Sequence, residues 1–246
     1  MSSIPLHFSS FGVKLVLGME NFSDPKKGAK MNYLVVTAHS GDEILGCGGT
    51  IRKLSLTGSS VSVCTLDGSG GNCGGKDDES IEDHRLELRK LGVKESYLLE
   101  KRRDSVPFSN LVSFIEKCIV DSNADSIITY HPAIGDRERQ MASKAVQKAS
   151  QLFKRRKDVK PLAALLYMEF PSATDISLDP TVKWFSPNFY VTLDEEILLS
   201  KLDALSSLSC LSALTSLETV RSVAVMRGSQ SGAMYSEAFE SVYIRV

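Results

Sequence analysis

His39, Asp42 and Glu43 lie between a short apolar run at residues 33–36 and a glycine-rich segment. The run is typical of a buried parallel strand, so these polar residues are expected at its carboxyl end, where open α/β folds bind ligands. His39 and Asp42 are three residues apart, which lets both side chains approach one metal ion if the turn folds back. Catalytic zinc usually takes three protein ligands, so a third must come from elsewhere. The alternative is a capping or core role for this pair.

The elements that would position these residues alternate along the chain. The predicted strands are residues 33–38, 61–66, 96–99, 125–130 and 163–168, and the predicted helices are 43–57, 79–91, 108–121 and 138–154. Repeated strand-helix-strand units predict an α/β fold with a mostly parallel sheet, right-handed crossovers and flanking helices. Beyond residue 171 we expect a strand at 189–193 and a leucine-rich helix at 195–217.

The composition is that of an ordinary globular protein. The chain has 246 residues, of which 42% are hydrophobic and 24% charged, so neither disorder nor a membrane class is indicated. A formal net charge of −1 gives no general attraction to nucleic acid. No apolar run reaches the roughly 18 residues that a membrane span needs. The five cysteines form no CxxC pair, which favours buried thiols in a reducing compartment, and we expect a cytoplasmic protein.

Loop signals separate the first residues from the rest of the chain. Asp24-Pro25 followed by Gly28 marks a loop, so residues 1–30 are predicted to be an N-terminal extension. Residues 31–246 contain no linker-like stretch and are predicted to form a single domain.

Several motifs together resemble one known family. The segment VVTAHSGDEILGCGGTI, residues 35–51, is similar to the opening motif of the PIG-L/LmbE-like zinc-dependent N-deacetylases, in which a strand leads into Ala-His-Pro-Asp-Asp-Glu and a glycine-rich helix start. Further segments resemble the family in the same order, at residues 65–68, 91–93, 103–104, 227–228 and 235–239. The likeness therefore covers nearly the whole chain from residue 31 onward.

The resemblance implies a Rossmann-like sheet, zinc as cofactor, and removal of the acetyl group from an N-acetylglucosamine-type sugar conjugate. By position, His39 and Asp42 match two zinc ligands, and Glu43 matches the glutamate of the motif. Gly41 stands where the family has its catalytic base. Arg139 stands where the family has a histidine as its third ligand.

These departures predict a weak or inactive hydrolase. Unit charges 4 Å apart interact by about 4 kcal/mol at an effective dielectric of 20, so a divalent ion facing a guanidinium would lose roughly twice that. A rebuilt site could take His131, Asp136 or Glu138 as its third ligand. Asp136 and Glu43 are the candidates for a replacement base. The alternative is that Asp136 caps a helix and Glu138 lies in its first turn.

The remaining candidate residues concern the substrate. By resemblance, Asp67 and Gly68 belong to a substrate-facing strand end, and Asp104 matches an aspartate that contacts sugar hydroxyls. Glu237 lies in the C-terminal motif, where it could face the substrate or anchor the chain. Three functions stay open: a degenerate relative of the deacetylases, a deacetylase with a rebuilt metal site, and a non-catalytic sugar-binding or assembly partner. Hydratase or lyase chemistry on small organic acids would need the same metal.

Overall fold

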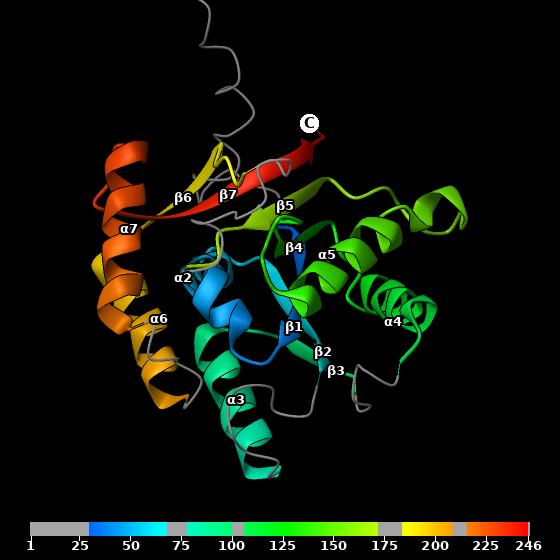
Figure 1. Cartoon of the computed structure of the whole chain (residues 1–246), viewed down its shortest axis with the longest axis horizontal. Coiled ribbons are helices and arrows are strands. Elements are labelled where there is room, and N and C mark those ends of the chain that lie inside the picture. Colours follow the sequence, from blue (N-terminus) through cyan, green and yellow to red (C-terminus); the bar gives the residue numbers. More distant parts are fainter. Residues whose placement is uncertain (1–29, 68–77, 100–105, 172–183, 209–215, 246) are drawn as a thin grey trace, which may run out of the picture. The chain divides into compact units, whose positions relative to one another are not determined.

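The computed structural model describes residues 30–67, 78–99, 106–171, 184–208 and 216–245. Within them, a seven-stranded sheet has the order β3-β2-β1-β4-β5-β7-β6 (Figure 1). The strands are β1 Asn32–His39, β2 Ser60–Asp67, β3 Glu95–Leu98, β4 Ser126–Tyr130, β5 Ala164–Met168, β6 Phe189–Leu193 and β7 Tyr235–Ile244. Neighbouring strands from β3 to β5 pair in parallel, whereas β7 is antiparallel to both β5 and β6. The predicted α/β fold with a mostly parallel sheet is confirmed.

Helices cover the sheet in two groups (Figure 1). The helices are α2 Asp42–Leu56, α3 Asp78–Leu91, α4 Phe108–Asp121, α5 Arg137–Ala149, α6 Glu195–Ser207 and α7 Leu217–Ser231. α4 packs on α5 in one group, and α2, α3 and α6 pack on one another in the other group, with α7 beside α6 and β7. This arrangement is the one that right-handed crossovers produce when the chain leaves a central strand in both directions.

The order of the strands reverses between β1 and β4. The chain first moves outward from β1 through β2 to β3, then returns through α4 to β4 on the other side of β1. The loops at the carboxyl ends of β1 and β4 therefore leave in opposite directions, which is the usual place of a ligand crevice in an open α/β sheet. His39 ends β1 opposite Asp67 at the end of β2, and Tyr130 ends β4.

The C-terminal third differs from the sequence prediction. The helix predicted over 195–217 is too long, because α6 ends at Ser207 and Leu208 follows it in an extended conformation. Residues 209–215 lie outside the described part of the chain, and α7 then begins after its N-cap Ser216. The predicted strand at 189–193 is confirmed as β6. The helix predicted over 138–154 ends at Ala149 and is followed by a single 3-10 turn, η3 Leu152–Lys154.

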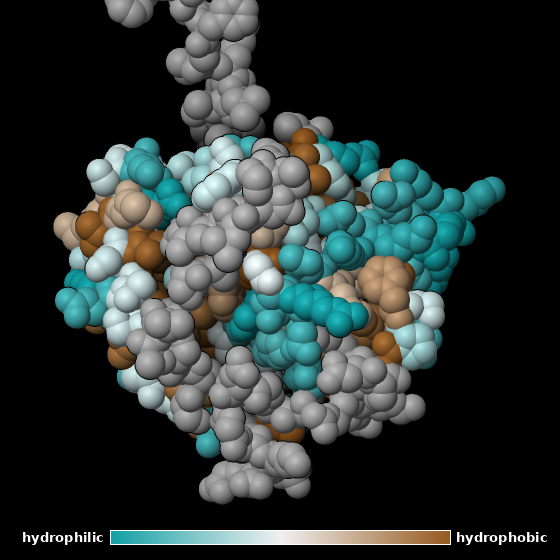
Figure 2. Space-filling model, viewed as in Figure 1, coloured by the Kyte–Doolittle hydropathy of each residue, from teal (hydrophilic) through white to brown (hydrophobic). Residues whose placement is uncertain are grey.

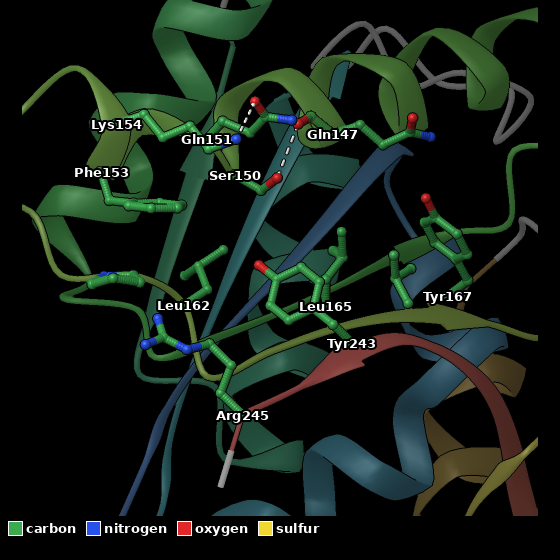
Figure 3. Close-up of a pocket in the computed structure, with 12 residues that line it drawn as sticks. Gln147, Ser150, Gln151, Phe153, Lys154, Leu162, Leu165, Tyr167, Tyr243 and Arg245 are labelled. Atoms are coloured by element: carbon green, nitrogen blue, oxygen red, sulfur yellow. Dashed lines mark hydrogen bonds between the residues drawn. The ribbon is translucent and has the colours of Figure 1, made fainter.

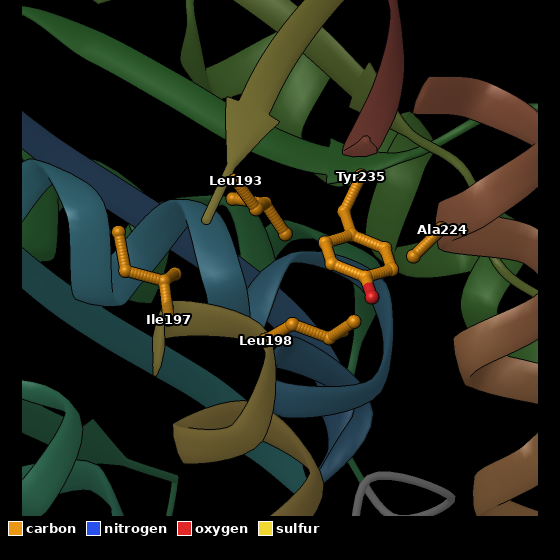
Figure 4. Close-up of a cluster of buried hydrophobic side chains, with 5 residues drawn as sticks. All are labelled: Leu193, Ile197, Leu198, Ala224 and Tyr235. Carbon is orange, nitrogen blue, oxygen red and sulfur yellow. The ribbon is translucent and has the colours of Figure 1, made fainter. Parts of the chain in front are cut away.

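Apolar side chains join the C-terminal elements to one another. Leu193 of β6, Leu198 of α6, Ala224 of α7 and Tyr235 of β7 form one buried cluster together with Ile197 (Figure 4). Apolar residues also reach the surface, which is hydrophilic over α5 and carries apolar areas over α7 in Figure 2. Among the described helices, none is both long enough and apolar enough to cross a membrane.

The cysteines that the structure describes are buried free thiols, as predicted for Cys47, Cys64 and Cys118. Burial raises the pKa of the Cys47 and Cys64 thiols well above the ordinary value, so they remain protonated. Cys73 and Cys210 lie outside the described residues.

Glu237 is a buried anchor between β7 and α2. Its carboxylate accepts hydrogen bonds from the backbone amides of Gly49 and Thr50, at 3.0 and 2.7 Å, and from the Thr50 hydroxyl at 2.6 Å. The ammonium of Lys201 on α6 lies 2.6 Å from Oε1, and both charged side chains are 5% exposed. Of the two roles open to Glu237, the structure places it in the anchoring one, since every contact described for its carboxylate is made within the protein core.

Glu237→Leu is expected to lower the free energy of unfolding by about 3–5 kcal/mol, because it leaves the Lys201 ammonium buried without its partner. The double variant Glu237→Leu/Lys201→Met should recover the part of this loss that comes from the unpaired charge, but not the part that comes from the Gly49 and Thr50 donors left without an acceptor. Urea unfolding followed by circular dichroism measures both. A single variant as stable as wild type would contradict the anchoring role.

Candidate active site

Arg139 and Asp42 form a bidentate ion pair between the first turns of α5 and α2. Nε of Arg139 donates to Oδ2 of Asp42 over 2.9 Å, and Nη2 donates to Oδ1 over 2.9 Å. The hydroxyl of Tyr130 donates to the same Oδ2. Donors of the protein itself therefore occupy both oxygens of the Asp42 carboxylate.

The guanidinium of Arg139 is held inside the site rather than extended into solvent. The Arg139 side chain is 16% exposed, and its Cζ lies 4.5 Å from the centroid of the Phe170 ring. Burial by itself would lower the pKa of Arg139, but the hydrogen bonds and charge of Asp42 raise it above its ordinary value. The group is therefore a permanent cation at the position where the family resemblance places a metal ligand.

Asp136 fixes the first turn of α5 and so the direction of Arg139. It is the N-cap of α5, and its Oδ1 accepts hydrogen bonds from the backbone amides of Glu138 and Arg139, at 2.9 and 2.8 Å. One oxygen of the carboxylate that was a candidate base and a candidate third ligand is thus engaged at the helix terminus.

Tyr130 connects β4 to the ion pair and was not among the predicted site residues. It is completely buried, and its oxygen accepts the backbone amide of Ala38 at 2.8 Å while its proton goes to Asp42. Burial and the charge of Asp42 raise the pKa of Tyr130 well above the ordinary value, so the hydroxyl stays protonated and remains a donor. The sequence signal that could have indicated Tyr130 is its position as the last residue of the buried strand β4.

His39 pairs with Glu138 beside the Arg139–Asp42 pair. His39 Nε2 lies 2.8 Å from Oε2 of Glu138. The other ring nitrogen, Nδ1, is buried and has no hydrogen-bond partner among the described residues. An imidazole that donates Nε2–H to Glu138 leaves only an acceptor at Nδ1, so this tautomer fits the surroundings best. His39, Glu138 and Asp67 each offer one potential metal-ligand atom, and these three atoms lie within 4.8 Å of one another.

Glu43 lies beneath the turn, where His84 of α3 neutralises it. Its Oε1 accepts the amide of Gly41 at 3.0 Å and lies 2.5 Å from Nε2 of His84, and Thr37 donates to Oε2 at 3.1 Å. Glu43 has no exposed surface, so the second candidate base is also committed to protein contacts. Gly41 itself has φ of 91°, a left-handed conformation that disfavours the aspartate expected there.

His131 belongs to a different cluster. Its Nε2 lies 3.4 Å from Oε2 of Glu240, its Nδ1 accepts the amide of Ala133 at 3.1 Å, and its ring packs edge-on against Tyr167 and Phe185. These contacts direct His131 toward β5 and β7. The predicted substrate residues Gly68 and Asp104 lie outside the described residues.

The zinc set that the resemblance implies does not fit this arrangement. Asp42 is saturated by Arg139 and Tyr130, and the third ligand position is occupied by Arg139 itself. Metal binding through these residues would therefore require the ion pair to open.

Comparison with known proteins agrees with the sequence motifs. Residues 34–150 match the family model of PIG-L, the GlcNAc-PI de-N-acetylases. A comparison with curated protein sequences gives no match.

Solved structures share the fold at low sequence identity. A conserved protein from Thermus thermophilus has a TM-score of 0.71 and 20% identity, covering 88% of this chain and 96% of its own. The N,N'-diacetylchitobiose deacetylase from Pyrococcus horikoshii has a TM-score of 0.67 and 21% identity, and the match covers 92% of this chain and 90% of the deacetylase. The 4-carboxy-2-hydroxymuconate hydratase from Pseudomonas putida has a TM-score of 0.68 and 18% identity, and the match covers 88% of this chain and 98% of the hydratase. Because a deacetylase and a hydratase both share it, the fold alone does not select the reaction.

The buried Glu43–His84 pair makes stability depend on pH. Burial by itself raises the pKa of Glu43, but His84 and the Gly41 amide bring it below its ordinary value of 4.5. Burial by itself lowers the pKa of His84, but Glu43 raises it above its ordinary value of 6.5. The His84 contribution is complete below pH 6.5 and is lost as pH rises through the folded-state pKa, whereas that of Glu43 is complete above pH 4.5 and is lost on acidification.

His84→Gln should therefore destabilise the protein most between pH 4.5 and 6.5, by about 3 kcal/mol. The difference from wild type should shrink as the pH is raised through the folded-state pKa of His84. Urea unfolding at a series of pH values measures it, with Asp83→Asn, an exposed neighbour on α3, as the control. A penalty that stays constant over the whole series would show that the pair is not charged in the folded state.

Proposed function

We propose, on the premise that this chain is a member of the PIG-L family through residues 34–150, that its cleft recognises an N-acetylated sugar conjugate and that the family's hydrolysis is lost or strongly weakened. The observation that carries this proposal is the bidentate pair of Arg139 with Asp42. It supports a site in which an internal cation has replaced the metal ion.

Electrostatics favours the guanidinium over a metal ion at this position. A dication placed about 4 Å from Arg139 would be repelled by roughly 8 kcal/mol at an effective dielectric of 20. Its binding would also have to replace two charge-assisted hydrogen bonds to Asp42, which are among the stronger kind. Neither cost arises while Arg139 holds Asp42 and no metal ion enters the site.

The positions predicted to supply a general base have no side chain or are engaged in other contacts. Gly41 offers no side chain at the base position, Asp136 caps α5, and Glu43 is paired with His84. Loss of a general base alone costs about 10²- to 10⁴-fold in rate. These contacts support a slow or silent site rather than an efficient hydrolase.

The class of ligand follows from the family and from a structural neighbour. The description of the family model, GlcNAc-PI de-N-acetylase, names an N-acetylglucosamine conjugate. The Pyrococcus horikoshii neighbour is a deacetylase of N,N'-diacetylchitobiose. Asp67 lies at the carboxyl edge of the sheet beside His39 and is only partly buried, so it is the described residue that we assign to sugar hydroxyls. Gly68 and Asp104 are proposed to contribute from their adjoining segments.

A rebuilt metal site is the second candidate. The potential metal-ligand atoms of His39, Asp67 and Glu138 lie within 4.8 Å of one another. Zinc accepts such a mixed set of histidine and carboxylate ligands. This set differs from the family's by excluding Asp42, so the two sites can be told apart by mutation.

Protein purified without chelator is expected to contain no zinc at this site, and Arg139→His is expected to gain up to one zinc per chain. The imidazole removes the guanidinium charge and supplies the missing ligand. Arg137→His is the matched control, because Arg137 is an exposed residue of the same helical turn and should gain nothing. Elemental analysis after gel filtration measures the metal content.

Zinc in the wild-type protein would contradict the internal-cation proposal, and the ligand variants would then identify the site. Loss of zinc in Asp67→Asn but not in Asp42→Asn would support the rebuilt set. Loss in Asp42→Asn but not in Asp67→Asn would support the family's own set with Arg139 displaced.

N,N'-diacetylchitobiose is expected to bind the wild-type chain without release of acetate. Asp67→Asn should weaken binding by about tenfold, the effect of losing one charge-assisted hydrogen bond. Isothermal titration calorimetry measures the affinity, an enzymatic acetate assay measures hydrolysis, and Asp203→Asn on the exposed side of α6 is the control. Absence of binding would contradict sugar recognition, and acetate release would contradict the loss of hydrolysis.

A further inference from the structure

A cleft of about 360 Å³ lies on the face of the sheet covered by α5, away from the candidate active site (Figure 3). Its lining includes Leu162, just before β5, and Arg245, just after β7. Ala164 and Ile244 pair at this end of the two strands, so the cleft reaches the amino-terminal edge of the parallel sheet. The Arg139–Asp42 pair lies at the opposite, carboxyl edge.

The cleft has an apolar, aromatic floor and a polar wall. Leu165 and the ring of Tyr243 lie at its centre in Figure 3, with the rings of Phe153 and Tyr167 on either side. The end of α5 and the turn after it supply the wall, where Ser150 donates to the Gln147 carbonyl at 2.9 Å. Its volume falls within the range of roughly 300–1,000 Å³ typical of small-molecule sites.

The charges in the cleft are all positive. Lys154 and Arg245 line it, and its lining contains no aspartate or glutamate. Within the described part of the chain, Lys154 contacts the Gln151 amide oxygen at 3.2 Å and the Phe153 ring, and neither it nor Arg245 has a carboxylate partner.

The two cations that follow Lys154 in the sequence are different, because acidic side chains neutralise them. Arg155 pairs with Glu116, and Arg156 pairs with Asp158. Lys154 instead faces a hollow that aromatic rings make attractive to a flat ligand.

We propose that this cleft is a second ligand site for a small aromatic carboxylate. The ring of the ligand packs between the aromatic side chains over Leu165, and its carboxylate lies between Lys154 and Arg245. Both features are needed, since the rings provide apolar area and the two cations provide the only charges in the lining.

The test uses the full chain and 1-naphthoate as the probe, with affinity measured by isothermal titration calorimetry. Lys154→Gln and Arg245→Gln should each weaken binding by about tenfold, the effect of one charge-assisted hydrogen bond. Lys148→Gln, which removes an exposed charge of α5 outside the cleft, should leave the affinity unchanged. Gln151→Trp, at an exposed lining position, should block the cleft and abolish binding.

The neutral analogue 1-naphthalenemethanol and competition with sugar complete the test. The proposal expects the analogue to bind at least about tenfold more weakly than the carboxylate, and expects N,N'-diacetylchitobiose not to compete. No binding of naphthoate at millimolar concentration, equal binding of the neutral analogue, or unchanged affinity in both charge variants would overturn it. Competition by the sugar would also overturn it, because the probe would then occupy the other site.

Discussion

The ion pair between Arg139 and Asp42 is the interaction on which the arrangement of the site depends. It connects the first turn of α5 with the first turn of α2 across the point where the strand order reverses. Both side chains are largely buried, so removing either one would leave an uncompensated charge, at a cost of about 3–5 kcal/mol. Each partner therefore holds the other in place, and a metal ion would have to displace the pair as a unit.

The same principle governs the polar groups around this pair. Glu138 is matched by His39, Glu43 by His84, and, deeper in the fold, Glu237 by Lys201. Tyr130 and the N-cap Asp136 then fix the orientation of the central pair. A hydrolytic metal site needs the opposite arrangement, in which carboxylate and imidazole lone pairs are left for the ion and for water. Here the lone pairs of the Asp42 and Glu43 carboxylates are satisfied by the protein itself.

The sequence predicted the parallel sheet, but it did not indicate Tyr130 and His84 as residues of the site, nor the direction of the Arg139 side chain. Buried parallel strands are continuous apolar runs, so β1, β2 and β4 were recognisable from composition alone. Positional matching brought Arg139 to the third ligand position, yet a helix position does not reveal whether a long side chain turns inward or toward solvent. Burial beneath Phe170 and the two oxygens of Asp42 decide this, and both are tertiary features.

The errors elsewhere have similar physical causes. The leucine-rich segment was predicted to be one helix because leucines recur at helical spacing, but Leu208 leaves the helix in an extended conformation. α7 was missed because its buried residues, Val220, Ala224 and Gly228, are mostly small, so the sequence shows no clear apolar stripe at helical spacing. His84 was missed because its partner Glu43 lies 41 positions away in the sequence.

A crystal structure of the chain grown with excess zinc, with anomalous data collected at the zinc edge, tests directly whether Arg139 replaces the metal ion. We expect the guanidinium of Arg139 on Asp42 and no anomalous peak between His39 and Asp42. A peak coordinated by His39 and Asp42, with Arg139 turned toward solvent, would show that the site binds zinc as the family's does.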